Sequence, residues 1–220
     1  MRLPKPLKAV ILDMDGTLHD TEPVYHAALR KAVAAVGFSV TEGFVHSLIG
    51  IPGKETDEML KAHLGPEFPF DTYDRLYDEY CEALLAEGVR LKPGVTELLD
   101  LLDERRLPVA IATSASRRAA TLHLMRSGLG TRITRVVTRD DVARGKPHPD
   151  PFLAAARLVG AAPEHCLAVE DSFNGVRAAH AAGMMAVMVP DILAPTEEIR
   201  ALCVTVAADL HAVRGLVAEG

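Results

Sequence analysis

The chain has 220 residues, of which 49% are hydrophobic and 25% charged, and its formal net charge is −6. This length allows one domain with an insertion or two small domains, and the composition is that of a globular protein. The negative charge argues against nonspecific nucleic-acid binding, which needs a basic face. It does not exclude a phosphorylated ligand, because a local cation can offset the ligand's charge.

The start of the sequence and its cysteines lead us to expect a cytoplasmic protein. The apolar run at 7–12 is too short for a signal sequence or a membrane span. Cys81, Cys166 and Cys203 are odd in number and widely spaced, which favours free thiols over a disulfide or a zinc site. We expect no membrane partner, and a monomer is the default.

The first predicted element is a buried parallel strand at 7–12. It leads into Asp13-Met14-Asp15-Gly16-Thr17, which places two carboxylates two residues apart before a glycine-marked turn. Open α/β sheets bind ligands at the carboxyl ends of their strands. The acid pair therefore indicates chemistry with a cation, although a solvated turn is the alternative interpretation of this string.

Residues 19–88 have helical periodicity, and no strand is predicted there. Segment 50–55 is expected to be a loop. The predicted helices cover 24–36, 59–64 and 73–85, and Gly37, Gly65 and Gly88 end them.

Strands and helices alternate from residue 93 onward, which predicts a parallel sheet covered on both faces. The expected fold class is therefore α/β, with a doubly wound, Rossmann-like core at 1–18 and 92–220 and an inserted all-helical domain at 19–91. The predicted strands are 109–113, 135–138, 167–170, 186–189 and 204–207, and the predicted helices are 96–106, 116–127, 151–158, 175–182 and a C-terminal one.

Three later motifs stand at strand ends or in loops. They are the hydroxyls of Thr113-Ser114, Lys146 in a proline-rich loop, and the acid pair Glu170-Asp171. With Asp13, and in this order, they resemble the haloacid dehalogenase superfamily. The subgroup is that of β-phosphoglucomutase-like and pseudouridine-5′-phosphatase-like phosphatases with a helical cap. The resemblance covers about residues 8–190 and implies that the helical insertion is a cap over the active site.

The resemblance assigns the two acids after the first strand to catalysis. A phosphate monoester repels nucleophiles, so a metal and fixed donors must offset its charge. Asp13 is the expected nucleophile, forming an aspartyl phosphate. Asp15 is the expected general acid, which then acts as a base toward water.

The expected cofactor is Mg²⁺, with Asp13, Asp15, Glu170 and Asp171 as the metal site. Asp171 is predicted to bind directly, Glu170 through water, and Asp15 through its backbone carbonyl. Asp171-Ser172 is also placed to cap the following helix, and both roles can hold.

Phosphate contacts are expected from Lys146, as a point charge, and from Ser114 with the Ala115 amide at a helix N-terminus. Thr113 is a rival of Ser114. For each candidate in the cap, the sequence favours an ordinary surface or core residue over a substrate contact. The other substrate-binding candidates are Gly16, Thr17 and Asn174 in the core and Glu22, Tyr25, His26 and Lys54 in the cap.

The expected function is hydrolysis of a small phosphorylated metabolite, sugar-phosphate-like, by a Mg²⁺-dependent phosphatase. A β-phosphoglucomutase-type mutase is the alternative, and Thr17 and Tyr25 favour the phosphatase by comparison with the family. Asp15, Glu170 and Asp171 count against a dehalogenase. A non-enzymatic phospho-receiver domain would be shorter and lack the helical insertion.

Overall fold

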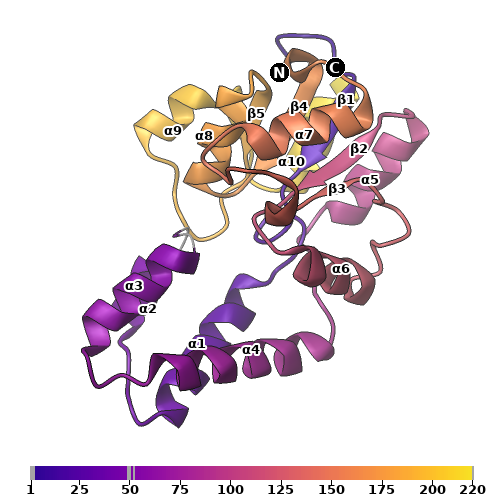
Figure 1. Ribbon diagram of the computed structural model, residues 1–220. Helices are drawn as coiled ribbons and strands as arrows, with labels where there is room; N and C mark the ends of the chain where they lie inside the picture. The colour runs from indigo at the N-terminus through magenta and orange to yellow at the C-terminus, as the bar shows by residue number, and fades with distance from the viewer. Residues whose placement is uncertain (1–2, 49–50, 52, 220) are drawn as a thin grey trace. The chain divides into compact units, whose positions relative to one another are not determined.

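The computed structural model of the protein describes residues 3–48, 51 and 53–219 (Figure 1). The chain forms two compact units. The α/β unit comprises Met1–Asp20 and Arg90–Gly220, and the helical unit comprises Thr21–Val89. The predicted fold class, a parallel α/β sheet with an all-helical insertion after the first strand, is confirmed.

A six-stranded sheet forms the α/β unit, with the order β3-β2-β1-β4-β5-β6 and every neighbouring pair parallel. The inner strands are apolar, except for Glu170 at the end of β4, because helices cover both of their faces. The strands are β1 (Ala9–Leu12), β2 (Val109–Ala112), β3 (Val136–Val137), β4 (Cys166–Glu170), β5 (Met185–Met188) and β6 (Thr205–Val206).

The two faces of the sheet carry different cores, because successive strand residues point to opposite sides. Val10 and Leu12 belong to one core, whose helices are α5 (Val95–Glu104), α6 (Arg117–Arg126) and α10 (Leu210–Glu219). Ala9 and Ile11 belong to the other, which α7 (Asp150–Val159) and α8 (Phe173–Ala181) cover. In Figure 1, α7 lies in front of the sheet.

Three short elements of the α/β unit were not predicted. α9 (Glu197–Leu202) begins at Thr196, whose hydroxyl accepts a hydrogen bond from the Ile199 amide (3.3 Å). Two 3₁₀ turns, η1 (Arg139–Asp141) and η2 (Pro163–His165), precede α7 and β4.

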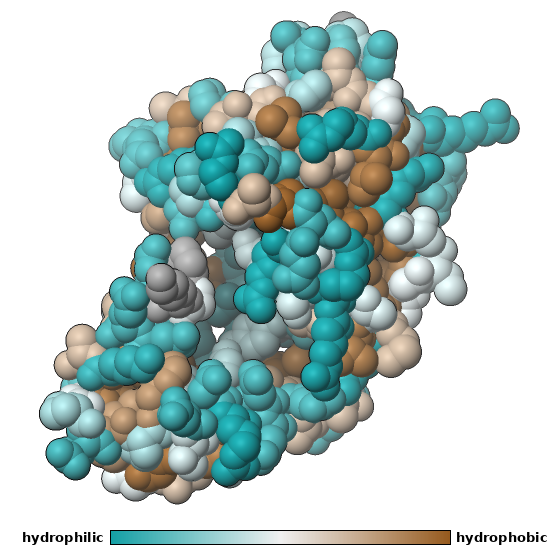
Figure 2. All heavy atoms as spheres, viewed as in Figure 1, coloured by the Kyte–Doolittle hydropathy of each residue, from teal (hydrophilic) through white to brown (hydrophobic). Residues whose placement is uncertain are grey.

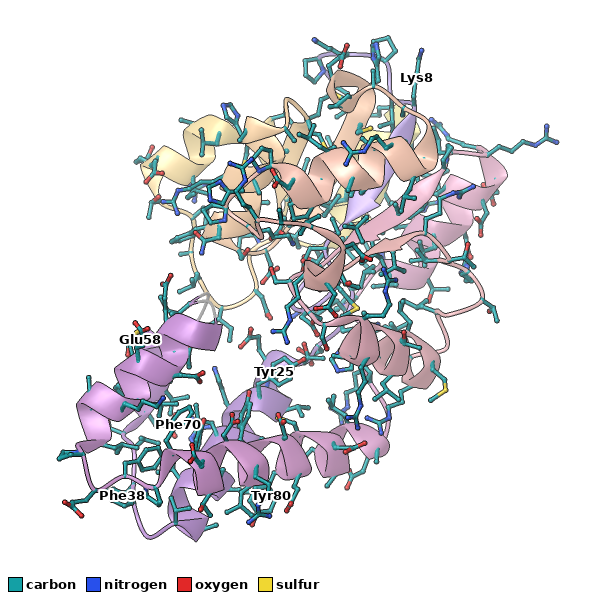
Figure 3. All side chains as sticks on the ribbon, in the orientation of Figure 1. Lys8, Tyr25, Phe38, Glu58, Phe70 and Tyr80 are labelled. Atoms are coloured by element: carbon teal, nitrogen blue, oxygen red, sulfur yellow. The ribbon has the colours of Figure 1, made fainter. Side chains whose placement is uncertain are left out.

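The helical unit consists of α1 (Glu22–Ala35), α2 (Glu42–Ser47), α3 (Gly53–Leu64) and α4 (Phe70–Ala86). Its core contains buried aliphatic side chains and an aromatic group in which the Phe68 and Tyr73 rings lie 5.2 Å apart. Phe38 and Phe70 pack against this core (Figure 3).

The helical unit differs from the prediction in two places. The sequence analysis missed α2, although Thr41 caps it by accepting from the Phe44 amide (3.2 Å). The loop predicted at 50–55 is wrong for Gly53–Glu55, which form the first turn of α3. Gly50 and Pro52 lie outside the described residues.

The faces of both units seen in Figure 2 are covered mainly by hydrophilic residues, with apolar side chains scattered among them. Within residues 3–48, 51 and 53–219, every helix is too short or too polar to span a lipid bilayer.

Candidate active site

The acids predicted from the sequence stand at the carboxyl edge of the sheet. Asp13 directly follows β1, and its amide donates a hydrogen bond to the Val169 carbonyl of β4 (2.9 Å). Asp171 directly follows β4 and therefore reaches the same edge. β1 and β4 are neighbours although the chain forms β2 and β3 between them, so the strand order reverses here. Open α/β sheets bind their ligands at such a point.

Three carboxylates gather at this edge. Oxygens of Asp13, Glu170 and Asp171 lie within 4.8 Å of one another. The Lys146 ammonium, brought in by the loop before α7, donates hydrogen bonds to Asp13 Oδ1 and Glu170 Oε1. Three carboxylates and one ammonium leave two negative charges in a largely buried place, which a divalent cation would neutralise. Since carboxylate oxygens are also what Mg²⁺ prefers, the donor set fits such an ion.

Burial governs the protonation of this cluster. It raises the pKa of Asp13 well above its ordinary value. Lys146 opposes this rise in pKa, whereas the charges of Glu170 and Asp15 add to it. Burial likewise raises the pKa of Asp171, and the charges of Asp13 and Glu170 act in the same direction. A bound cation would therefore favour the ionised form of both aspartates.

Lys146 stays charged in this place. Burial alone would lower the pKa of its ammonium, but the carboxylates of Asp13 and Glu170 outweigh burial and raise that pKa above its ordinary value. The side chain is thus a fixed positive charge beside the predicted nucleophile.

Glu170 is held from two sides. Its Oε2 accepts hydrogen bonds from the Asp171 amide (3.1 Å) and from the amide and hydroxyl of Ser172 (3.0 and 2.9 Å), while Oε1 accepts from Lys146. Ser172 Oγ also accepts from the Gly175 amide (3.0 Å), which confirms the predicted cap of α8. Glu170 therefore orients Lys146, and its contact with a metal through water stays a prediction.

Gly16 and Thr17 surround the Asp171 carboxylate. Gly16 has a φ of +83°, and a Cβ there would lie 2.3 Å from Asp171 Oδ2. Thr17 Oγ1 donates a hydrogen bond to Asp171 Oδ1 (3.2 Å). The two residues thus hold a predicted metal ligand in place. Their predicted contact with substrate is a separate role that these bonds leave open.

Asp15 lies beside two buried histidines that sequence reasoning missed. Its Oδ1 is 3.3 Å from His123 Nδ1. The His19 and His123 rings meet edge to face with centroids 6.1 Å apart. Burial lowers the pKa of His19 to about 4 despite the opposite effect of Asp15, so this ring is neutral at neutral pH. No regular spacing joins the two histidines, but each directly adjoins a core leucine, Leu18 or Leu124, and this was a usable signal of burial.

The hydroxyls after β2 have different surroundings. Thr113 is buried, and its Oγ1 accepts a hydrogen bond from the Ala115 amide (3.0 Å). Ser114 is exposed. Ser116 caps α6 by accepting from the Ala119 amide (3.2 Å). The geometry favours Ser114 as the hydroxyl left to meet a ligand, whereas the Ala115 amide already has an acceptor.

The remaining candidates lie on three helices, one in the α/β unit and two in the helical unit. Asn174 lies in the first turn of α8. Glu22 begins α1, with its Oε2 3.5 Å from His26 Nε2, and Tyr25 lies on the same helix (Figure 3). Lys54 belongs to α3, and its side chain lies outside the described residues. These positions stay predictions.

The chain matches known proteins over most of its length. A family model described as haloacid dehalogenase-like hydrolase matches residues 7–183. The phosphorylated carbohydrates phosphatase of Thermotoga maritima is 33% identical over 178 residues, which cover 81% of this chain and 82% of that protein. Hexitol phosphatase A of Escherichia coli is 34% identical over 181 residues, 80% of each chain.

A solved structure, CbbY from Rhodobacter sphaeroides in complex with phosphate, is also similar. It matches with a TM-score of 0.80 and 27% identity, and the match covers 93% of this chain and 95% of that one. The family resemblance drawn from the motifs is therefore confirmed. This chain belongs to the haloacid dehalogenase-like hydrolase family.

Proposed function

We propose that this protein is a Mg²⁺-dependent phosphatase that hydrolyses a small phosphorylated sugar, with Asp13 as the covalent nucleophile. One observation carries the proposal: a buried carboxylate at the point where the strand order reverses, held by Lys146 within a cluster of net negative charge. The relatives named for phosphorylated carbohydrates and for hexitol, and the similar structure with bound phosphate, support this substrate class.

The residues suited to hold Mg²⁺ are Asp13 and Asp171, with the backbone carbonyl of Asp15 as the family resemblance implies. The ion would offset the charge of the phosphoryl oxygens and of the two aspartates. Thr17 and Gly16 keep the Asp171 carboxylate at the edge where it is needed.

In the first step, a carboxylate oxygen of Asp13 attacks phosphorus. The new O–P bond forms as the ester O–P bond breaks, and the departing alkoxide takes the proton of the Asp15 carboxyl group. Lys146 offers positive charge where the phosphoryl oxygens arrive, and the exposed Ser114 hydroxyl donates to one of them.

In the second step, Asp15 acts as a base. Its carboxylate takes a proton from water as the water oxygen attacks phosphorus, which breaks the Asp13 O–P bond and releases inorganic phosphate. The two aspartates therefore need different protonation, and their surroundings differ accordingly. The Asp13 side chain is 9% exposed and bound to Lys146, whereas the Asp15 side chain is 21% exposed and faces His123.

The proposal is tested by measuring phosphate released from a panel of sugar phosphates in the presence of Mg²⁺. We expect turnover of at least one hexose or hexitol phosphate, and loss of that turnover in Asp13→Asn. Asp103→Asn, which alters an exposed carboxylate of α5, is the matched control and should keep full activity. Undiminished turnover in a folded Asp13→Asn protein would contradict the proposal.

A second arm separates hydrolysis from phosphoryl transfer between sugar hydroxyls. The protein is incubated with β-glucose 1-phosphate and a trace of the glucose bisphosphate. We expect free phosphate as the product. Accumulation of glucose 6-phosphate instead would identify a mutase and overturn the phosphatase assignment while keeping Asp13 as the nucleophile.

A further inference from the structure

A second group of potential metal ligands lies next to the acid cluster in the α/β unit. One carboxylate oxygen of Asp15 and one ring nitrogen each of His19 and His123 lie within 4.8 Å of one another. His19 is 0% exposed and His123 is 3% exposed. The three side chains come from two parts of the fold: Asp15 and His19 from the loop after β1, and His123 from α6.

Ser127 contacts one ring nitrogen of His19. The His19 Nε2 atom lies 2.9 Å from Ser127 Oγ. When the Ser127 hydroxyl donates its hydrogen to the Leu124 carbonyl (3.2 Å), it accepts from His19. That arrangement places the proton on Nε2 and the lone pair on Nδ1.

That lone pair is unused within the described part of the chain. His19 Nδ1 is buried and has no hydrogen-bond partner there. A buried polar atom without a partner carries a free-energy cost, and a bound ion is one way to remove it. A second-sphere hydrogen bond that fixes the tautomer is the usual support of a metal-binding histidine, and Ser127 is placed to accept one.

We propose that Asp15, His19 and His123 form a second metal site, which takes Zn²⁺ or a similar first-row transition ion. Two imidazole nitrogens and one carboxylate are a donor set typical of Zn²⁺, with a fourth position left for water. The acid cluster, in contrast, offers oxygens alone and suits Mg²⁺. Ligand atoms around tetrahedral zinc are about 3.4 Å apart, so the set closes by side-chain rotation, for which the partly exposed Asp15 has freedom.

An ion at this site inhibits the enzyme, because it occupies the Asp15 carboxylate that the reaction needs for proton transfer. This consequence rests on the proposed function, whereas the binding itself does not. The inhibition would differ from displacement of Mg²⁺, since excess Mg²⁺ does not compete for imidazole ligands.

The experiment uses the whole protein with saturating Mg²⁺ and one equivalent of Zn²⁺. X-ray absorption at the zinc edge is expected to show imidazole scattering from two histidines. Zinc affinity is measured in the same buffer with a chromophoric chelator. His19→Gln and His123→Gln should each weaken it by about tenfold or more, since even outer partners of a metal site have effects of that size.

His211→Gln, which removes an exposed histidine of α10, is the matched control and should keep the wild-type affinity. Oxygen-only coordination in the wild-type protein overturns the site, as does unchanged zinc affinity in the two histidine variants. If a buried-histidine variant does not fold, the wild-type spectrum still decides. An inactive protein that binds Zn²⁺ through histidine refutes the proposed function alone, and an active one that zinc does not inhibit refutes only the inhibition.

Discussion

Two glycines leave the space that carboxylates of the acid cluster occupy. Gly175 is in the first turn of α8, and a Cβ there would lie 1.8 Å from Glu170 Cδ, inside the carboxylate that anchors Lys146. Gly16 gives the Asp171 carboxylate the same kind of space. Each glycine therefore has a role that helix or turn propensity does not explain.

Gly175→Ala tests this role. Alanine normally stabilises a helix relative to glycine, but here the clash with Glu170 should lower the free energy of unfolding by about 1–3 kcal/mol. Gly215→Ala in α10 is the matched control, since nothing lies within 4 Å of its Cβ position, and it should raise stability by about 0.5–1 kcal/mol. Urea unfolding measures both, and equal behaviour of the two variants would contradict the close approach.

The lowered pKa of His19 predicts that the protein becomes less stable as the pH falls. The pKa of His19 is lowered from 6.5 in the unfolded chain to about 4 in the folded protein. Between these values the unfolded state binds the extra proton, so stability falls as pH drops from 6.5 toward 4, by about 3 kcal/mol from this residue. Thermal unfolding of wild type and His19→Gln across this range should show a shallower decline in the variant. A parallel decline in both would refute the buried neutral ring.

At the level of elements, the adjacent ends of β1 and β4 concentrate the negative charge. The pKa values of Asp13 and Asp171 are raised in the folded protein. At pH values above the ordinary carboxyl pKa, the folded state therefore still holds protons that the unfolded state has lost. Without a metal, stability therefore falls as pH rises through this range. A cation that binds the ionised cluster reverses the trend.

Asp171→Asn separates these contributions. The variant removes one of three clustered charges and keeps an acceptor for Thr17, so without metal at pH 7.5 it should be more stable than wild type by about 1–3 kcal/mol. Mg²⁺ at a hundred times its dissociation constant should stabilise wild type by about 2.7 kcal/mol and leave the variant unchanged. Calorimetry with and without Mg²⁺ decides, and equal Mg²⁺ responses would exclude Asp171 as a ligand.

We expect different roles for Thr113 and Ser114, the two hydroxyl residues that directly follow β2. Thr113→Ala removes the acceptor of the Ala115 amide and should cost about 1–2 kcal/mol of stability. Ser114→Ala alters an exposed side chain, so stability should change by less than about 0.5 kcal/mol while kcat falls about a hundredfold. Urea unfolding and phosphate release measure the pair, and the reverse pattern would assign the phosphate contact to Thr113.

The elements also illustrate which parts of a fold local patterns can predict. β1, β2, β4 and β5 lie inside or within a residue of their predicted ranges, because apolar runs that end in turns are typical of strands buried on both faces. The helices α2 and α9 were missed because each has six residues, too few to establish a period. Their threonine caps, Thr41 and Thr196, were the available signals.

For the molecule as a whole, the sequence predicted contacts between distant residues only where those residues stand at the ends of neighbouring strands. Asp13, Glu170 and Asp171 follow or end neighbouring parallel strands, so their gathering follows from the topology. The pairing of Asp15 with His123 depends on how α6 packs, and no local pattern contains that information. The substrate contacts expected from Glu22 and Lys54 belong to the helical unit and remain predictions.

The central claim is that Asp13 takes up a phosphoryl group. Acid quenching during turnover of the best sugar phosphate, followed by peptide mass spectrometry, measures this most directly. The account predicts one phosphoryl group on the peptide that contains Asp13, and none in Asp13→Asn. Rapid turnover with no adduct on Asp13 at any quench time, together with full activity of the folded Asp13→Asn variant, would contradict it.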